Sequence, residues 1–197
     1  MVDAVDEQVQ NALQAMRGML GFTSVVFGRL DSDRGGLVLS FAMGDRESIF
    51  RAAAEVLGFD PTGAAFPLWA EESLFVRCYR QGRIVLSTDI ADLFRGALPE
   101  DTFDEFASTV GPRLFVCVPV PGRSGAIVAV MLFDREGIEP LNAEERERLL
   151  LYAARLGELL ESSRLGSLPI DAGQDSPVTR WLSVYLLDRA MNTVWSA

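Results

Sequence analysis

The sequence predicts an α/β (α+β) fold, in which a central antiparallel sheet carries the terminal helices on one face and an irregular helical segment on the other. Amphipathic helical patterns stand near both ends of the chain, at 3–20 and 142–164. Between them, two pairs of apolar runs flank short stretches of turn-forming residues, which is typical of hairpins. The second pair, within 113–133, is apolar on both alternating faces, so each face of the sheet needs a covering layer.

The N-terminal part predicts a helix, a hairpin and a second helix. The first helix, at 3–20, has apolar side chains three and four residues apart, namely Val5, Val9, Leu13, Met16 and Leu20. The hairpin joins strands at 23–30 and 37–43 through a turn rich in Asp and Gly. The second helix, at 48–57, is expected to end at Gly58.

The middle of the chain has a less regular pattern. Residues 59–75 contain Pro61, Gly63 and Pro67, which favours irregular chain lying over a core. Short elements are expected next: helices at 73–81, 89–95 and 99–111 and a strand at 83–87.

The C-terminal part gives the clearest prediction. Apolar strands at 114–120 and 126–133 flank a Gly-containing turn and form a hairpin. Asn142-Ala-Glu-Glu145 is a capping-box pattern, which opens a long helix through about residue 164.

These elements define the expected domain organisation. Residues 1–165 form one domain, since 197 residues suffice for one sizeable core and fall short of two ordinary ones. Gly166, Pro169 and Gly173 indicate a linker at 166–176. The extension at 177–197 is compatible with a helix, a hairpin or the start of another domain.

The charge of the chain argues against polyanionic partners. The 18 Lys and Arg residues face 28 Asp and Glu residues, which leaves this acidic protein with a net charge of −10. Nucleic acids and anionic membranes attract cationic surfaces, so neither is expected to bind. The start of the chain lacks a signal-peptide pattern, and no run of about eighteen apolar residues occurs, which indicates a cytoplasmic protein.

Two missing residue types exclude whole reaction classes. The chain has no His, and all its cationic side chains are Arg. Nucleophile–histidine pairs, His-ligated metals, phosphoacceptor histidines and Schiff-base lysines are therefore excluded. We expect no metal site, no cofactor and no catalytic residues. An enzyme that uses carboxylates alone is the weaker alternative. Its candidate carboxylates have no base or metal motif beside them, and they are Glu71, Glu72, Asp101, Asp104 and Glu105.

The cysteines are too few for a disulfide framework or a four-thiolate metal site. Cys78 and Cys117 each lie in an apolar stretch, which indicates reduced core cysteines. A redox-sensing role for Cys117 would require a lowered pKa and access to solvent, and its place in an apolar strand argues against both.

Two stretches resemble the GAF domain family in their residues. Residues 79–94 are similar to the family's G-x-x-v-x-x-x-D strand, here from Gly82 to Asp89. Residues 115–133, followed by Leu141-Asn-Ala-Glu-Glu145, are similar to the family's final hairpin and the helix after it. The order of elements over about residues 5–164 is also that of the family.

The chain departs from the family's best-understood branches. Ala129 stands where the family usually keeps a Gly. The residue sets of the cyclic-nucleotide, bilin-binding and methionine-sulfoxide-reducing branches are missing. The resemblance therefore implies a GAF domain of the bacterial signalling type, with a GAF/PAS-like sheet. It does not indicate which ligand the domain binds.

The resemblance also implies a place for a ligand, between the sheet and the irregular segment. Aromatic and apolar side chains are expected there, and the candidate residues are Phe41, Phe66, Trp69, Phe75, Tyr79, Phe115, Cys117 and Met131. The same side chains could instead fill a dry core, because aromatics bury large areas in any fold. A ligand at this site is expected to be small and largely apolar or aromatic.

Three arginines near this site are candidates for contacts with an acid group of the ligand. Arg77, Arg80 and Arg83 could each bind a carboxylate through two N–H groups. The alternative is that they pair with acidic residues nearby, such as Glu71, Glu72 or Asp89.

The long C-terminal helix has more apolar surface than one sheet face can cover. Leu149, Leu156 and Leu160 form the stripe expected to pack on the sheet. Four apolar residues are left over, and they are Leu150, Leu151, Ala154 and Leu159. Since soluble monomers avoid exposed apolar patches, these residues predict a homodimer interface, with the helix at 3–20 beside it.

Three readings of function stay open. In the first, the chain is a sensory module without catalytic activity, which binds a small molecule and signals through its terminal helices to a protein partner. In the second, it is a dimerisation or protein-interaction scaffold that binds no ligand. In the third, it is a fragment of a larger GAF-PAS sensor, because residues 184–188 and 194–195 faintly resemble PAS strands.

Overall fold

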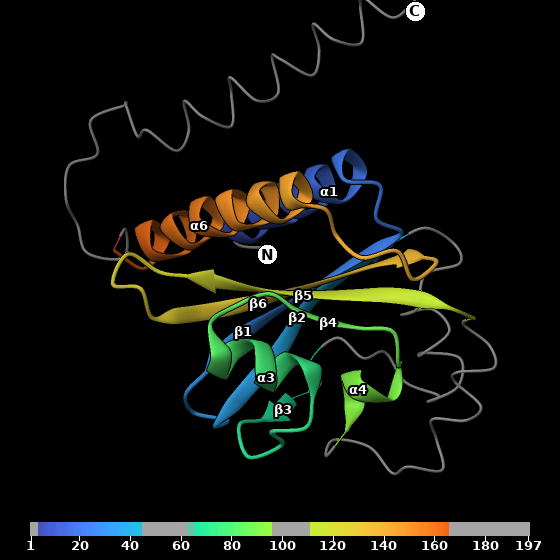
Figure 1. Cartoon of the computed structure of the whole chain (residues 1–197). Coiled ribbons are helices and arrows are strands. Elements are labelled where there is room, and N and C mark those ends of the chain that lie inside the picture. The colour runs from blue at the N-terminus through green and yellow to red at the C-terminus, as the bar shows by residue number, and fades with distance from the viewer. Residues whose placement is uncertain (1–3, 45–62, 64, 96–110, 166–197) are drawn as a thin grey trace, which may run out of the picture. The chain divides into compact units, whose positions relative to one another are not determined.

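The structure is a computed structural model, and it describes residues 4–44, 63, 65–95 and 111–165 (Figure 1). The chain divides into two compact units, Met1–Glu161 and Ser162–Ala197, and the fold below is that of the first. The helices expected at 48–57 and 99–111 lie outside the described residues, apart from Gly111. The linker and the C-terminal extension lie outside them altogether.

A six-stranded antiparallel sheet forms the centre of the unit, with the strand order β3-β2-β1-β6-β5-β4. Its strands are β1 (Ser24–Asp31), β2 (Gly36–Gly44), β3 (Ala65–Pro67), β4 (Val85–Ser87), β5 (Arg113–Pro121) and β6 (Ile127–Glu136). The two expected hairpins are present as β1–β2 and β5–β6, and β1 pairs with β6 to join them. The predicted mixed fold with one antiparallel sheet is confirmed.

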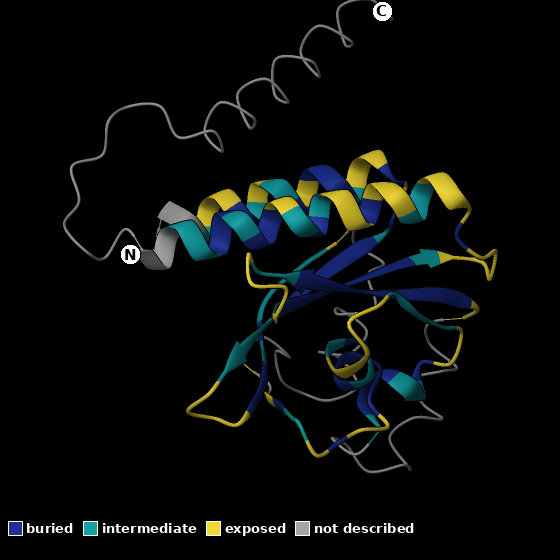
Figure 2. Ribbon diagram, turned by 60° about the vertical axis from the view of Figure 1, so that its left-hand side comes forward, coloured by how far each residue is buried: buried dark blue, intermediate teal, exposed yellow. Residues whose placement is uncertain are grey.

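The terminal helices cover one face of this sheet. Figure 1 shows α1 (Ala4–Met19) and α6 (Ala143–Leu165) side by side on that face, while α3 (Leu74–Gln81) and α4 (Ala91–Phe94) lie on the other. In Figure 2 each terminal helix buries one side and exposes the other, as its apolar spacing predicts. We call these layers the α1–α6 layer and the α3–α4 layer.

The start of α6 is a capping box, as the sequence predicts. The backbone N–H of Asn142 donates to the Glu145 carboxylate at 2.8 Å, and the N–H of Glu145 donates to the Asn142 side-chain oxygen at 2.9 Å. Each side chain thereby satisfies a backbone donor that the first helical turn leaves without a partner. Arg135 of β6 adds an ion pair to Glu145 at 2.6 Å, which ties the helix start to the sheet.

One short strand replaces part of the segment expected to be irregular. Residues Ala65–Pro67 form β3, which pairs with β2 at the edge of the sheet. The close pairing depends on Gly36, because a Cβ atom there would lie 2.5 Å from the carbonyl oxygen of Phe66. Pro67 ends the strand, since it has no N–H for further pairing.

Candidate functional site

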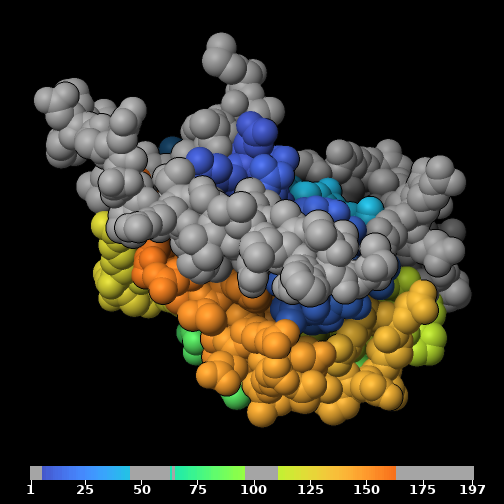
Figure 3. All heavy atoms as spheres, turned by 90° about the horizontal axis from the view of Figure 1, so that it is seen from above, coloured from blue at the N-terminus to red at the C-terminus, as the bar shows by residue number. Residues whose placement is uncertain are grey.

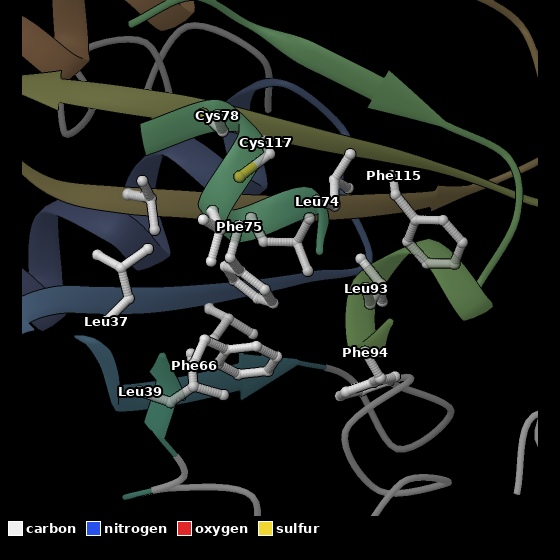
Figure 4. Close-up of a cluster of buried hydrophobic side chains, with 14 of the residues drawn as sticks. Leu37, Leu39, Phe66, Leu74, Phe75, Cys78, Leu93, Phe94, Phe115 and Cys117 are labelled. Carbon is white, nitrogen blue, oxygen red and sulfur yellow. The ribbon is translucent and has the colours of Figure 1, made fainter. Parts of the chain in front are cut away.

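A cluster of buried apolar side chains fills the space between the sheet and the α3–α4 layer, and we call it the α3-side cluster (Figure 4). Its members are Val26, Leu37, Leu39, Phe66, Leu74, Phe75, Val76, Cys78, Ile90, Leu93, Phe94, Phe115, Cys117, Val130 and Leu132. Phe66 contacts two aromatic rings, with centroid distances of 4.7 Å to Phe75 and 6.2 Å to Phe94. The cluster therefore has a strongly aromatic centre.

Five of the eight candidate pocket residues come together here. Phe66, Phe75, Phe115 and Cys117 are buried members of the α3-side cluster, and Tyr79 packs against it half-buried. They reach it from β3 and α3, which are close in the chain, and from β5, which is distant from both.

Phe41 and Met131 lie on the opposite face of the sheet, so assigning them to the pocket was wrong. Both are paired with Phe27 of β1, and Phe41 stacks on Phe27 with ring centroids 6.0 Å apart. Their strand neighbours Ala42 and Val130 face the α3-side cluster instead. Successive side chains of a strand point to opposite faces, which places Phe41 and Met131 towards the α1–α6 layer.

Trp69 also lies away from the cluster, with 73% of its surface exposed. The chain turns after β3, where the N–H of Ala70 donates to the Pro67 carbonyl at 2.9 Å. Ala70 is buried in this turn, and Trp69 is directed into solvent. The candidate contact of Trp69 with a buried ligand is therefore not supported by its position.

The three candidate anion contacts have partners of their own. Arg77 forms an ion pair with Asp92 of α4 at 3.0 Å, and Arg80 forms one with Glu71 at 3.2 Å. Arg83 donates to the side chain of Gln81 at 3.0 Å. For Arg77 and Arg80, the alternative of pairing with nearby acidic residues describes the geometry.

A buried polar group that the sequence analysis missed lies on the same face as the α3-side cluster. Ser24, Arg113 and Asp134 each stand two residues from a cluster member of their own strand, and the period of two places them on its side. Arg113 Nη1 lies 2.6 Å from Asp134 Oδ2, and the Ser24 hydroxyl donates to Asp134 Oδ1. The alternation of β5 and β6 was the signal that could have found them.

Burial dominates the electrostatics of this polar group. It raises the pKa of Asp134 above its ordinary value, although the Ser24 hydroxyl and the Arg113 cation act in the opposite direction. A buried carboxylate is costly to ionise, and the Ser24 hydroxyl and the Arg113 cation offset part of that cost.

The described residues show neither a metal centre nor a membrane span. Within 4–44, 63, 65–95 and 111–165, no three Cys, Asp or Glu side chains come together as metal ligands. No helix in that part of the chain is long and apolar enough to cross a membrane.

The candidate dimer residues belong to α6. Figure 3 shows this helix, in orange, from above. Leu150 and Leu151 are exposed by 48% and 55%, and Ala154 is half-buried. Leu159 is buried like Leu156 and Leu160, so its assignment to the exposed homodimer interface was wrong. The buried stripe of α6 widens towards its C-terminal half and takes in this residue.

Comparison with protein families and with curated proteins gives one match. The sequence model of the GAF domain matches residues 3–161. A search of curated proteins found no significant match.

Among solved structures, the chain is similar to a methyl-accepting chemotaxis protein, residues 122 to 287, with 20% identity and a TM-score of 0.59 over 86% of this chain and 95% of that one. It is also similar to the GAF domain of a two-component sensor histidine kinase from Bacillus halodurans, with 16% identity and a TM-score of 0.59 over 82% and 97%.

A third similar structure is an enzyme, the free methionine-R-sulfoxide reductase from Neisseria meningitidis in complex with its substrate. It has 20% identity and a TM-score of 0.56, over 84% of this chain and 83% of that one. At these identities the likeness concerns the fold alone. The match to the family over most of the chain and the observed sheet with its two helical layers agree with each other, and the chain belongs to the GAF domain family.

Proposed function

We propose that the chain is a regulatory module without catalytic activity, which binds a small molecule on the α3 side of its sheet and signals through α1 and α6. The observation that carries the proposal is the separation of the two faces of one sheet. An aromatic cluster fills one face, and the terminal helices cover the other (Figure 1). Strands β1, β5 and β6 contribute side chains to both, so a change at one face reaches the other through the same backbones.

The α3-side cluster supports a ligand that is largely apolar or aromatic. Phe66, Phe75 and Phe115 supply ring surface, which favours offset stacking with an aromatic ligand. Arg113 and Asp134 offer charged contacts at one end of this face, and an acid group would pair with the arginine.

The chemistry of the described residues favours binding over catalysis. Burial raises the pKa of Cys117 well above its ordinary value, which disfavours a thiolate nucleophile. Asp134 is held by Ser24 and Arg113. Because one similar structure is a methionine sulfoxide reductase, an assay of free methionine-R-sulfoxide reduction tests this directly, and we expect no turnover.

The partner that fits the outer face of α6 is a second copy of the chain. Leu150 and Leu151 are exposed neighbours on this helix. A two-fold axis would bury both residues in both copies, at about 1.5 to 3 kcal/mol for each leucine fully buried. A signalling protein partner would then contact the dimer.

A scaffold that binds no ligand is the second candidate function, and one observation favours it. The members of the α3-side cluster are exposed by 0 to 5% only, so they pack against one another as in an ordinary core. Binding would then require α3 to move away from the sheet.

A thermal-shift screen of small aromatic carboxylic acids, followed by calorimetry, distinguishes the two functions. Phe75→Leu and Phe27→Leu form a matched pair, since both rings are fully buried but lie on opposite faces of the sheet. We expect the variant on the α3 side to lose affinity and the variant on the α1–α6 side to keep it. If no compound binds the wild type, the scaffold function is favoured. If both variants lose affinity equally, the ligand does not bind specifically on the α3 side of the sheet.

A further inference from the structure

The two cysteines of the chain, 78 and 117, meet in the folded protein. Cys78 lies on α3 and Cys117 on β5, and both are fully buried in the α3-side cluster (Figure 4). The two thiols interact electrostatically, and Cys78 is one of the groups that raise the pKa of Cys117. The Cys78 thiol also donates to the carbonyl oxygen of Arg83, at 3.5 Å, just beyond the end of α3.

This contact joins the layer that covers the candidate site to the sheet beneath it. The helix α3 contributes Leu74, Phe75, Val76 and Cys78 to the cluster, and β5 contributes Phe115 and Cys117. A bond between the two sulfur atoms would therefore hold the cover against the sheet. A disulfide needs its two Cα atoms within about 7 Å, which is compatible with the direct packing of α3 on β5.

We propose that Cys78 and Cys117 are a modification site, which a hydroperoxide converts to an intramolecular disulfide that ties α3 to β5. In the first step, the thiolate of one cysteine attacks the peroxide oxygen, which gives a sulfenic acid and, with a proton, releases water or an alcohol. In the second step, the other thiol attacks the sulfenic sulfur and releases water. The dithiol loses two electrons and two protons, and the peroxide is reduced.

The closed structure makes the first step slow. Burial, together with the Cys78 thiol, raises the pKa of Cys117 well above its ordinary value, and the nearby Arg77 cation acts in the opposite direction. The thiolate reacts, and the thiol does not. Oxidation therefore requires α3 to lift from the sheet and admit water and peroxide. The rate at which the pair is oxidised then depends on how often α3 moves away from the sheet.

The test uses the full chain, hydrogen peroxide and intact-mass measurement after the reaction is quenched with an alkylating reagent. We expect a loss of two hydrogen atoms, no alkylation in denaturant, and a single cross-linked peptide that contains Cys78 and Cys117. A reducing agent should restore both thiols. Mild denaturant should accelerate the reaction, because exposure to water lowers the pKa of Cys117 towards its ordinary value and admits the peroxide.

The variants Cys78→Ser and Cys117→Ser supply the matched controls, because each leaves one thiol and should give trapped sulfenic acid but no intramolecular disulfide. The oxidised wild type should melt several degrees higher, with slower amide hydrogen exchange in α3 than in the reduced form. Two free thiols after prolonged oxidation, a sulfinic acid, or a disulfide between two chains would each overturn the proposal. The wild-type measurement decides it even if a variant fails to fold.

Discussion

Arg113 of β5 and Asp134 of β6 form an ion pair of 2.6 Å with both side chains at least nine-tenths buried. Such a pair adds little net stability, because desolvation of two charges offsets their attraction. Removing one partner is different, since the other charge then stays buried alone. Single and double variants of this pair should therefore differ in their free energy of unfolding.

Arg113→Met should lower the free energy of unfolding at pH 7 by about 3 to 5 kcal/mol, measured by urea denaturation. The double variant with Asp134→Asn should recover more than half of that loss, because the amide oxygen still accepts from Ser24 without carrying a charge. Equal losses in the single and double variants would show that the pairing of the charges is not the cause.

The pH dependence of this variant follows from the raised pKa of Asp134. A carboxyl whose pKa is higher in the folded state binds its proton more tightly there, so its contribution to stability is present in acid and is lost as the pH rises through the folded pKa. Without Arg113 the pKa rises further. The defect of Arg113→Met should therefore be smaller at pH 4.5 than at pH 7, at about the same ionic strength.

Glu145 should show the opposite pH dependence. Partial burial raises its pKa, but hydrogen bonds from Arg135 and the backbone of Asn142 outweigh burial and lower it overall. Its contribution to stability is then present above the unfolded pKa and is lost as the pH falls through the folded pKa. Glu145→Gln should cost about 1 kcal/mol at pH 7 and much less near pH 3. A constant difference across this range would contradict the assignment.

Gly157 of α6 allows the turn between β5 and β6 to lie against the helix. A Cβ atom at 157 would lie 1.8 Å from the carbonyl oxygen of Pro121. Gly157→Ala should therefore destabilise the protein by about 1 to 3 kcal/mol, although alanine is the better helix former.

Gly18→Ala is the control for Gly157→Ala. Gly18 also lies within a helix, α1, and a Cβ atom there would meet nothing within 4 Å. This variant should gain about 0.5 to 1 kcal/mol in the same thermal or urea unfolding measurement. A loss at both glycines would point to the helices in general and away from the Pro121 contact.

Leu151→Glu tests the proposed homodimer. The side chain is 55% exposed, so a charge there should leave the fold intact and shift sedimentation from dimer towards monomer. Leu159→Glu should instead unfold the domain, because Leu159 is buried within the chain. A wild-type monomer at tens of micromolar concentration would rule out the dimer.

The sequence by itself determined the described helices α1, α3, α4 and α6, the two hairpins and the capping box of α6, because each depends on patterns within a few neighbouring residues. It also determined which side chains of one strand share a face. On this basis the GAF resemblance and the mixed fold were predicted correctly.

Only the tertiary structure decided which face of each strand met which layer. The pairing of β1 with β2 and β6 placed Phe41 and Met131 opposite the α3-side cluster, and the turn after β3 directed Trp69 outward. The packing of α3 on β5 brought Cys78 to Cys117. Such contacts join residues far apart in the chain, so they depend on strand register and layer packing, which no local period specifies.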